Sequence, residues 1–185
     1  YLTINISSPN TENLRNFHNK SELDQLLKII QEEKKILKSN ILIALKISPD
    51  IEEKNISNIS ELLLKYEVDI IIISNSTDQN RNNLKNINKL EKGGLSGKPL
   101  EKKSNILINK FYKVLSNRVK IIGVGGVDSG RSAYEKIING ATLVQLYTGM
   151  VYKGPNIARN ISEELINILK SEGIKNISEA IGIKN

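Results

Sequence analysis

Apolar and polar residues follow one another in blocks along the chain. Short, nearly continuous apolar runs predict strands at 1–4, 41–47, 69–73, 119–122 and 142–148. Amphipathic stretches between and after them predict helices at 21–37, with Ser21 as N-cap, and at 56–66, 101–115, 130–139, 156–170 and 178–181. Continuous apolarity is typical of strands that are buried on both faces of a parallel sheet. The pattern therefore predicts an α/β protein of strand–helix units.

The regular alternation of strand and helix indicates a parallel sheet with helices outside it. Polar residues follow each predicted strand, and ligand sites of parallel α/β folds gather at that edge. The polar, Asn-rich stretch 78–92 has no clear periodicity and predicts a long loop. No linker divides the chain, so residues 1–185 are expected to belong to one domain. Five strands are too few to close the eight-stranded barrel.

Composition narrows the possible functions. The net charge of +7 comes from lysines scattered among Asn and Ile, with few aromatic residues and no Trp, so no nucleic-acid partner is expected. No Cys is present, and His18 is the single histidine, so no disulfide, thiolate nucleophile or metal site is predicted. His18 is interpreted as a loop or helix-edge residue. No apolar run reaches transmembrane length.

The loop after the first predicted strand holds the densest cluster of hydrogen-bonding groups, in the run 5–11. Its Ser8 hydroxyl is a candidate for proton transfer. Asn5 and Asn10 of this loop, and Asn75 after the third predicted strand, can offer amides to a planar ring with several acceptors. The alternative is a Ser/Asn turn that caps the next helix.

A glycine turn at 123–126 lies between a predicted strand and a predicted helix. Glycines let the backbone approach an anion closely, and the N-terminus of the following helix offers free N–H groups. The next predicted strand ends in Tyr147 and Thr148, and the last two strand loops of barrels commonly bind phosphate. A phosphate site is therefore predicted here. The glycines do not match G-x-G-x-x-G in a first strand–helix unit, which disfavours a Rossmann fold.

Lys46 lies inside an apolar strand. An unpaired buried ammonium is costly, so a partner or an open pocket is expected. The lysine can form a Schiff base or offset negative charge on a bound ring. The alternative is an ion pair with a carboxylate such as Asp50.

Six motifs occur in one order along the chain: residues 5–11 with Leu14 and Arg15, and then 46–50, 74–77, 93–97, 123–126 and 145–148. This ordered set resembles the dihydroorotate dehydrogenase family over essentially the whole chain. The resemblance implies an FMN-dependent (β/α)8 TIM barrel that oxidises dihydroorotate to orotate in pyrimidine biosynthesis. Only about the last five strand–helix units of such a barrel are present here.

The resemblance also implies roles for individual residues. Ser8 falls at the position of the catalytic base. The substrate-contacting positions correspond to Asn5, Asn10, Asn75 and Ser76, and Ser76 stands where Thr is frequent. The FMN-binding positions correspond to Asn5, Lys46, Ser74, Gly97, Gly126, Tyr147 and Thr148.

Ser8 implies a subclass, because class 1 members of the family use Cys at this position. The resemblance is therefore to class 2, which passes electrons to a quinone. It implies a monomer whose full-length form associates peripherally with a bacterial inner membrane, on its cytoplasmic face, or with a mitochondrial inner membrane.

Residues 1–185 are expected to be the C-terminal portion of the barrel, because three strand–helix units of the family have no counterpart in them. The open sheet edges then predict that these residues neither fold stably nor turn over substrate alone. Two alternatives remain open at this point. One is a phosphate-binding aldolase or isomerase that uses Lys46, and the other is a non-catalytic barrel fragment or flavin-binding module.

Overall fold

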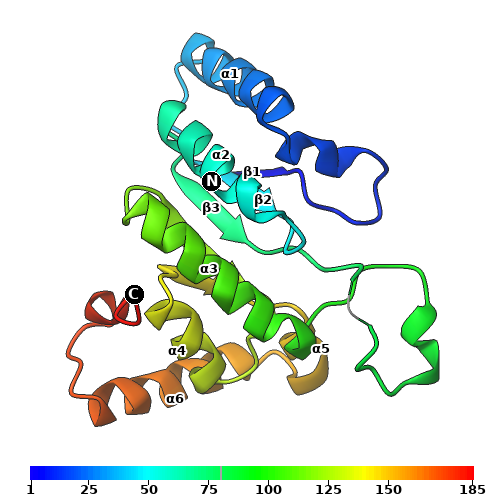
Figure 1. The fold of residues 1–185 in the computed structure, drawn as a ribbon. Helices are drawn as coiled ribbons and strands as arrows, with labels where there is room; N and C mark the ends of the chain where they lie inside the picture. Colours follow the sequence, from blue (N-terminus) through cyan, green and yellow to red (C-terminus); the bar gives the residue numbers. More distant parts are fainter. Residues whose placement is uncertain (80) are drawn as a thin grey trace.

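The sheet of the protein has five parallel strands, in a computed structural model that describes residues 1–79 and 81–185. The strands are β1 (Leu2–Asn5), β2 (Ile43–Ile47), β3 (Ile70–Ile73), β4 (Lys120–Val124) and β5 (Leu143–Gln145) (Figure 1). Each strand pairs with the next one in the chain, in the order β1-β2-β3-β4-β5. In a (β/α)8 barrel each strand lies beside the next one in the chain, as here. In a doubly wound sheet the strand order reverses direction partway through the sheet.

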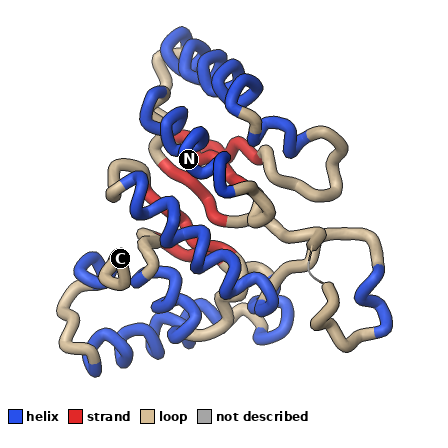
Figure 2. The backbone as a smooth tube through the Cα atoms, in the orientation of Figure 1, coloured by secondary structure: helices blue, strands red, loops and turns tan. Residues whose placement is uncertain are grey.

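Helices follow the strands on the outer side of the sheet. The α-helices are α1 (Lys20–Ile36), α2 (Glu53–Lys65), α3 (Glu101–Leu115), α4 (Gly130–Ile138), α5 (Thr148–Lys153) and α6 (Ile157–Ser171). Short 3₁₀ helices are η1 (Leu14–His18), η2 (Ile87–Leu90), η3 (Lys98–Leu100) and η4 (Ile177–Ala180). In Figure 2 the strands lie next to one another, and α2 and α3 cross in front of them. Among the described residues, no helix combines the length and the apolar composition needed to cross a membrane.

Both faces of the central strands are apolar, as their continuous hydrophobic runs predict. On one face, Leu45 and Ile71 pack in the main core with Phe111 of α3 and with residues of α1 and α2. On the other face, Ala44 and Ile72 belong to a smaller buried cluster. Since successive side chains of a strand point to opposite faces, an uninterrupted apolar run is what fills both sides.

Most element boundaries differ from the sequence prediction by a few residues, as at the starts of α1 and β2 and at the end of β5. Ser21 is not the N-cap of α1; that position is Asn19, and the Ser21 hydroxyl instead donates to Glu22 at 2.6 Å. Strand β2 begins at Ile43, so the expected start at residue 41 is wrong. The expected strand 142–148 ends at Gln145, because Tyr147 leaves extended geometry with φ −137° and ψ −64° and the chain enters the unpredicted helix α5.

The stretch 78–92 is a loop as predicted, apart from η2 within it, and residue 80 of that range lies outside the described residues. An isolated antiparallel β-bridge between Thr77 and Leu95 joins the two ends of this loop. His18 ends η1 and is buried, and its Nε2 accepts the N–H of Ser48 at 3.2 Å. The histidine thus links the first loop to the end of β2.

Candidate functional site

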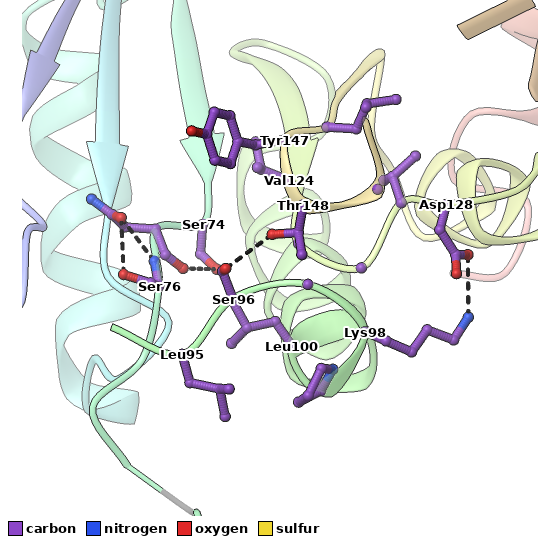
Figure 3. A pocket seen from close by; sticks show the side chains of 18 of the residues that line it. Ser74, Ser76, Leu95, Ser96, Lys98, Leu100, Val124, Asp128, Tyr147 and Thr148 are labelled. Atoms are coloured by element: carbon purple, nitrogen blue, oxygen red, sulfur yellow. Dashed lines mark hydrogen bonds and ion pairs between the residues drawn. The ribbon is translucent and has the colours of Figure 1, made fainter. Parts of the chain in front are cut away.

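A cavity of about 610 Å³ opens at the carboxyl ends of the strands (Figure 3). It is lined by the ends of β2 to β5 and by the segment that leads into η3. Eight of the residues singled out from the sequence line it: Lys46, Ser74, Asn75, Ser76, Gly97, Gly126, Tyr147 and Thr148. Residues far apart in the chain therefore meet in one place, because parallel strands end at the same edge.

The glycine turn after β4 presents unpaired backbone donors. Gly126 has a φ of +79°, and a Cβ added there would lie 2.5 Å from Cβ of Glu101 and 2.8 Å from its Cα. Neither the N–H of Gly125 nor that of Gly126 donates a hydrogen bond to any atom of residues 1–79 and 81–185. Because both glycines line the cavity, these two N–H groups suit an anion such as a phosphate.

The segment before η3 approaches the end of β5 closely. The hydroxyls of Ser96 and Thr148 lie 2.9 Å apart (Figure 3). Gly97 has a φ of +76°, and a Cβ there would lie 2.8 Å from Cγ2 of Thr148. Gly97 is thus required for this approach, which sets a hydroxyl pair beside the glycine turn.

Lys46 is half-buried on the cavity wall, and burial lowers the pKa of its ammonium. Within the described ranges no carboxylate lies within 4.0 Å of it. Asp50 instead forms ion pairs with Arg15 and Lys103, so the alternative of a Lys46–Asp50 pair is wrong. The Lys46 charge is therefore available to a ligand.

Asn5 and Asn75 join the loops after β1 and β3. Asn75 donates to Oδ1 of Asn5 at 3.4 Å and to the hydroxyl of Ser7 at 3.1 Å. Its own Oδ1 accepts the N–H of Ser76 at 2.8 Å. Asn5, Ser8 and Asn10 do not line the cavity itself; the loop that carries them lies beside it, tied by these amide contacts. The Ser8 hydroxyl accepts the N–H of Asn10 at 3.2 Å.

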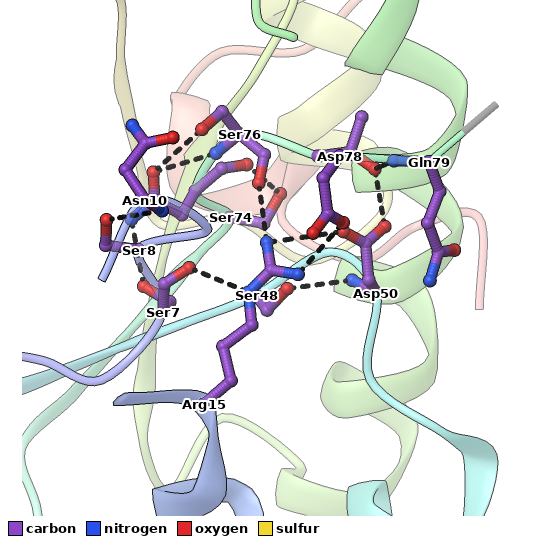
Figure 4. A network of polar contacts seen from close by, with 12 residues as sticks. Ser7, Ser8, Asn10, Arg15, Ser48, Asp50, Ser74, Ser76, Asp78 and Gln79 are labelled. Atoms are coloured by element: carbon purple, nitrogen blue, oxygen red, sulfur yellow. Dashed lines mark hydrogen bonds and ion pairs between the residues drawn. The ribbon is translucent and has the colours of Figure 1, made fainter. Parts of the chain in front are cut away.

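Arg15 holds three of these loops together (Figure 4). Its guanidinium donates to the carbonyl oxygens of Ser7 and Ser76, each at 3.4 Å. It also pairs with Asp50 at 3.4 Å and with Asp78 at 3.0 Å. The planar guanidinium has five N–H donors, enough for all four acceptors, whereas a lysine ammonium has three.

Asp50 is the buried centre of this network, with a side chain only 2% exposed. Besides the two cations, it accepts the hydroxyl of Thr77 at 2.6 Å. Sequence reasoning assigned no role to Arg15 or Lys103 and considered Asp50 only as a partner of Lys46. The position of Arg15 in the first motif was the available signal, but its partners come from other loops.

Replacing Asp50 tests whether this network supports the site. Asp50→Asn keeps the volume but leaves two cations without their shared carboxylate, and removing one partner of a buried pair costs about 3 kcal/mol of unfolding free energy or more. The matched control is Glu61→Gln, whose ion pair with Lys20 is exposed and is expected to change stability by less than about 1 kcal/mol. Urea unfolding of the intact protein measures the stability of both variants. Equal effects would contradict a supporting role for Asp50.

The chain is similar in sequence to proteins of one known family. A family model described as dihydroorotate dehydrogenase matches residues 1–169. A dihydroorotate dehydrogenase (quinone) of Buchnera aphidicola subsp. Schizaphis graminum (strain Sg) is 44% identical over 169 residues, which cover 89% of this chain and 50% of the relative. The mitochondrial dihydroorotate dehydrogenase (quinone) of Mus musculus is 39% identical over 185 residues, 99% of this chain and 47% of the relative.

A solved structure has the same fold. The crystal structure of DHODH from Eimeria tenella in complex with ferulenol superposes with a TM-score of 0.95 at 35% identity, and the match covers 100% of this chain and 54% of that one. The predicted partial (β/α)8 barrel is thereby confirmed. The chain spans about half the length of the relatives it matches. From the family match, the relatives and the shared fold, the chain belongs to the dihydroorotate dehydrogenase family.

Proposed function

We propose that the protein oxidises dihydroorotate to orotate with FMN, as a quinone-dependent class 2 enzyme of pyrimidine biosynthesis. The observation that carries the proposal is the cavity at the strand ends, where Lys46, Asn75 and Gly126 meet. Residues 1–185 supply one side of a single barrel domain in this proposal. The printed names of the bacterial and mouse relatives support the quinone as electron acceptor.

The cavity fits a flavin that carries a phosphate. The free N–H groups of Gly125 and Gly126 would hold the phosphate, with Thr148 beside them. The further residues that would hold the cofactor are Asn5, Lys46, Ser74, Gly97 and Tyr147. FMN, when bound, supplies the acceptor for the hydride that leaves C6 of dihydroorotate. Lys46 would place a positive charge beside the bound ring and stabilise negative charge on it.

Ser8 is the proposed base that takes the proton from C5 of dihydroorotate. Its hydroxyl accepts the N–H of Asn10, which orients it, and within the described part of the chain it donates no hydrogen bond. The hydroxyl proton is thus free to pass to a relay, which a weak base such as serine requires. Asn5, Asn10, Asn75 and Ser76 would bind the pyrimidine ring, since amides supply both donors and acceptors.

The partners follow from the same proposal. Dihydroorotate and orotate are the ligands of the site, and a quinone takes up the electrons. Peripheral association with a bacterial or mitochondrial inner membrane would bring the protein to that quinone. We further propose that the protein is a monomer.

The aldolase or isomerase alternative explains the phosphate site and Lys46 but gives the amides of Asn5 and Asn75 no role.

The role of Ser8 is tested by Ser8→Ala in the intact protein. Turnover of dihydroorotate is expected to fall about 100-fold or more, because removing a general base costs this much, while flavin absorbance stays unchanged. Ser21→Ala is the matched control, since this exposed hydroxyl lies on α1 and, among the residues that the structure describes, donates a hydrogen bond only to Glu22. Unchanged turnover in Ser8→Ala would reject Ser8 as the base. If dihydroorotate does not reduce and thereby bleach the flavin of the wild-type protein, the proposed activity is wrong.

The phosphate turn is tested by Gly126→Ala with Gly154→Ala as its control. Both glycines have nearly the same positive φ, +79° and +77°, which residues with a side chain rarely adopt, so both variants carry backbone strain. A Cβ at Gly126 collides with Glu101, whereas a Cβ at Gly154 would have no described residue other than its chain neighbours within 4 Å. The FMN dissociation constant is expected to rise about tenfold or more only for Gly126→Ala, the equivalent of about 1.4 kcal/mol. Equal rises in the two variants would remove the turn from the phosphate site.

A further inference from the structure

A fully buried lysine lies behind the glycine turn. Lys136 of α4 is 0% exposed, and its ammonium donates to the Ser104 hydroxyl at 3.1 Å and to Oδ1 of Asn105 at 2.9 Å. No carboxylate within the described ranges lies within 4.0 Å of it. A buried ammonium without a counter-ion is costly, and an apolar side chain would fill this place at less cost. The lysine is therefore not explained by packing.

A continuous chain of hydrogen bonds connects Lys136 to the cavity. The Ser104 hydroxyl, which accepts from Lys136, donates to the carbonyl oxygen of Val124 at 2.6 Å. That carbonyl belongs to the same peptide unit as the N–H of Gly125, one of the two unpaired donors of the turn. Hydrogen bonds in series polarise one another, so the ammonium strengthens this N–H as a donor to an anion.

The lysine stem runs along the end of β4. A Cβ added at Gly123 would lie 2.9 Å from Cδ of Lys136, so glycine is needed for the stem to pass. The same Ser104 hydroxyl also lies 3.3 Å from the carbonyl oxygen of Ile73, the last residue of β3. The ammonium is thus coupled to the ends of two strands that line the cavity.

Few other charges act on Lys136. Glu101 at the start of α3 favours its charged form, Lys98 of η3 opposes it, and these two side chains pair with each other at 2.5 Å. Burial has the largest effect and lowers the pKa of Lys136 to about 7. Without a ligand, the lysine is consequently balanced between its charged and neutral forms near neutral pH.

We propose that Lys136 is the buried counter-charge for the phosphate group bound at the Gly125–Gly126 turn, and that binding of the anion brings a proton onto Lys136. The proposal rests on the proposed binding of FMN. Lys136 does not touch the ligand; it is a positioning residue that acts through Ser104 and the Val124–Gly125 peptide.

The sign of the pH dependence follows from the lowered pKa. The folded protein without ligand binds fewer protons than the unfolded chain between about pH 7 and the ordinary lysine value, so its stability rises with pH in that window. A bound phosphate favours the ammonium, raises the pKa of Lys136 and so narrows this window. FMN affinity is therefore expected to fall as pH rises above 7, by up to about tenfold for each unit by which binding raises the pKa of Lys136.

The test compares FMN with riboflavin, which lacks the phosphate, in the intact protein freed of flavin. Lys136→Met is expected to weaken FMN binding about tenfold at pH 7 and to leave riboflavin binding unchanged. Ser104→Ala, which breaks the chain but keeps the lysine, is expected to weaken FMN selectively as well. Lys113→Met, on the exposed side of α3, is the matched control and is expected to change neither affinity.

Proton uptake is measured by titration calorimetry in two buffers of different ionisation enthalpy. At pH 8 the wild type is expected to take up about half a proton or more with FMN, and Lys136→Met is expected to take up none. Equal losses for FMN and riboflavin in both variants would make Lys136 merely structural and overturn the proposal, as would wild-type FMN affinity in Lys136→Met. A wild-type protein that binds neither flavin would refute the proposed function itself and the proposal with it.

Discussion

Parallel pairing in chain order is the constraint on which the rest of this structure depends. Each strand is in register with the next, from Leu2 beside Ile43 to Val124 beside Gln145, so every strand ends at the same edge. Loops that carry Asn75, Gly97 and Gly126 come from distant parts of the chain, yet the sheet brings them to one cavity. The chemistry of the site is thus a consequence of topology before it is a consequence of any single side chain.

Two networks of buried charged side chains hold the carboxyl ends of the strands in place. Around Asp50, the cations of Arg15 and Lys103 join the loops after the first three strands. Behind β4, Lys136 and Ser104 connect α4 and α3 to the end of that strand. Burying a charge costs free energy of folding unless an opposite charge, from the protein or from a ligand, lies close to it. The two networks differ in where this opposite charge comes from. Asp50 pairs with two cations, whereas the hydrogen-bond partners of Lys136 among residues 1–79 and 81–185 are neutral.

The sequence predicted the strands because their apolar runs are nearly continuous, as in Ile70–Ile73 and Ile43–Ile47. It also singled out eight of the residues that line the cavity, since polar groups that follow parallel strands lie at the same edge of the sheet. It missed helix α5, because the six residues Thr148–Lys153 are too few to show a helical period. Ser21 is not the N-cap because the helix begins one residue before it, at Lys20, which puts Asn19 in the cap position.

Contacts between loops were beyond the sequence. Arg15 reaches Ser76 and Asp78 across more than sixty residues of chain, and no local pattern encodes such a partner. Lys136 left a signal, since it occupies the buried face of α4 three residues after Ala133. A lysine at an apolar helix position indicates a buried charge, but only the structure identifies what it contacts.

A crystal structure of the intact protein with bound flavin tests the central claim most directly. The account predicts phosphate density against the backbone of Gly125 and Gly126, and the flavin ring beside Lys46 at the end of β2. Phosphate density at another edge of the sheet, or a ring remote from Lys46, would contradict it.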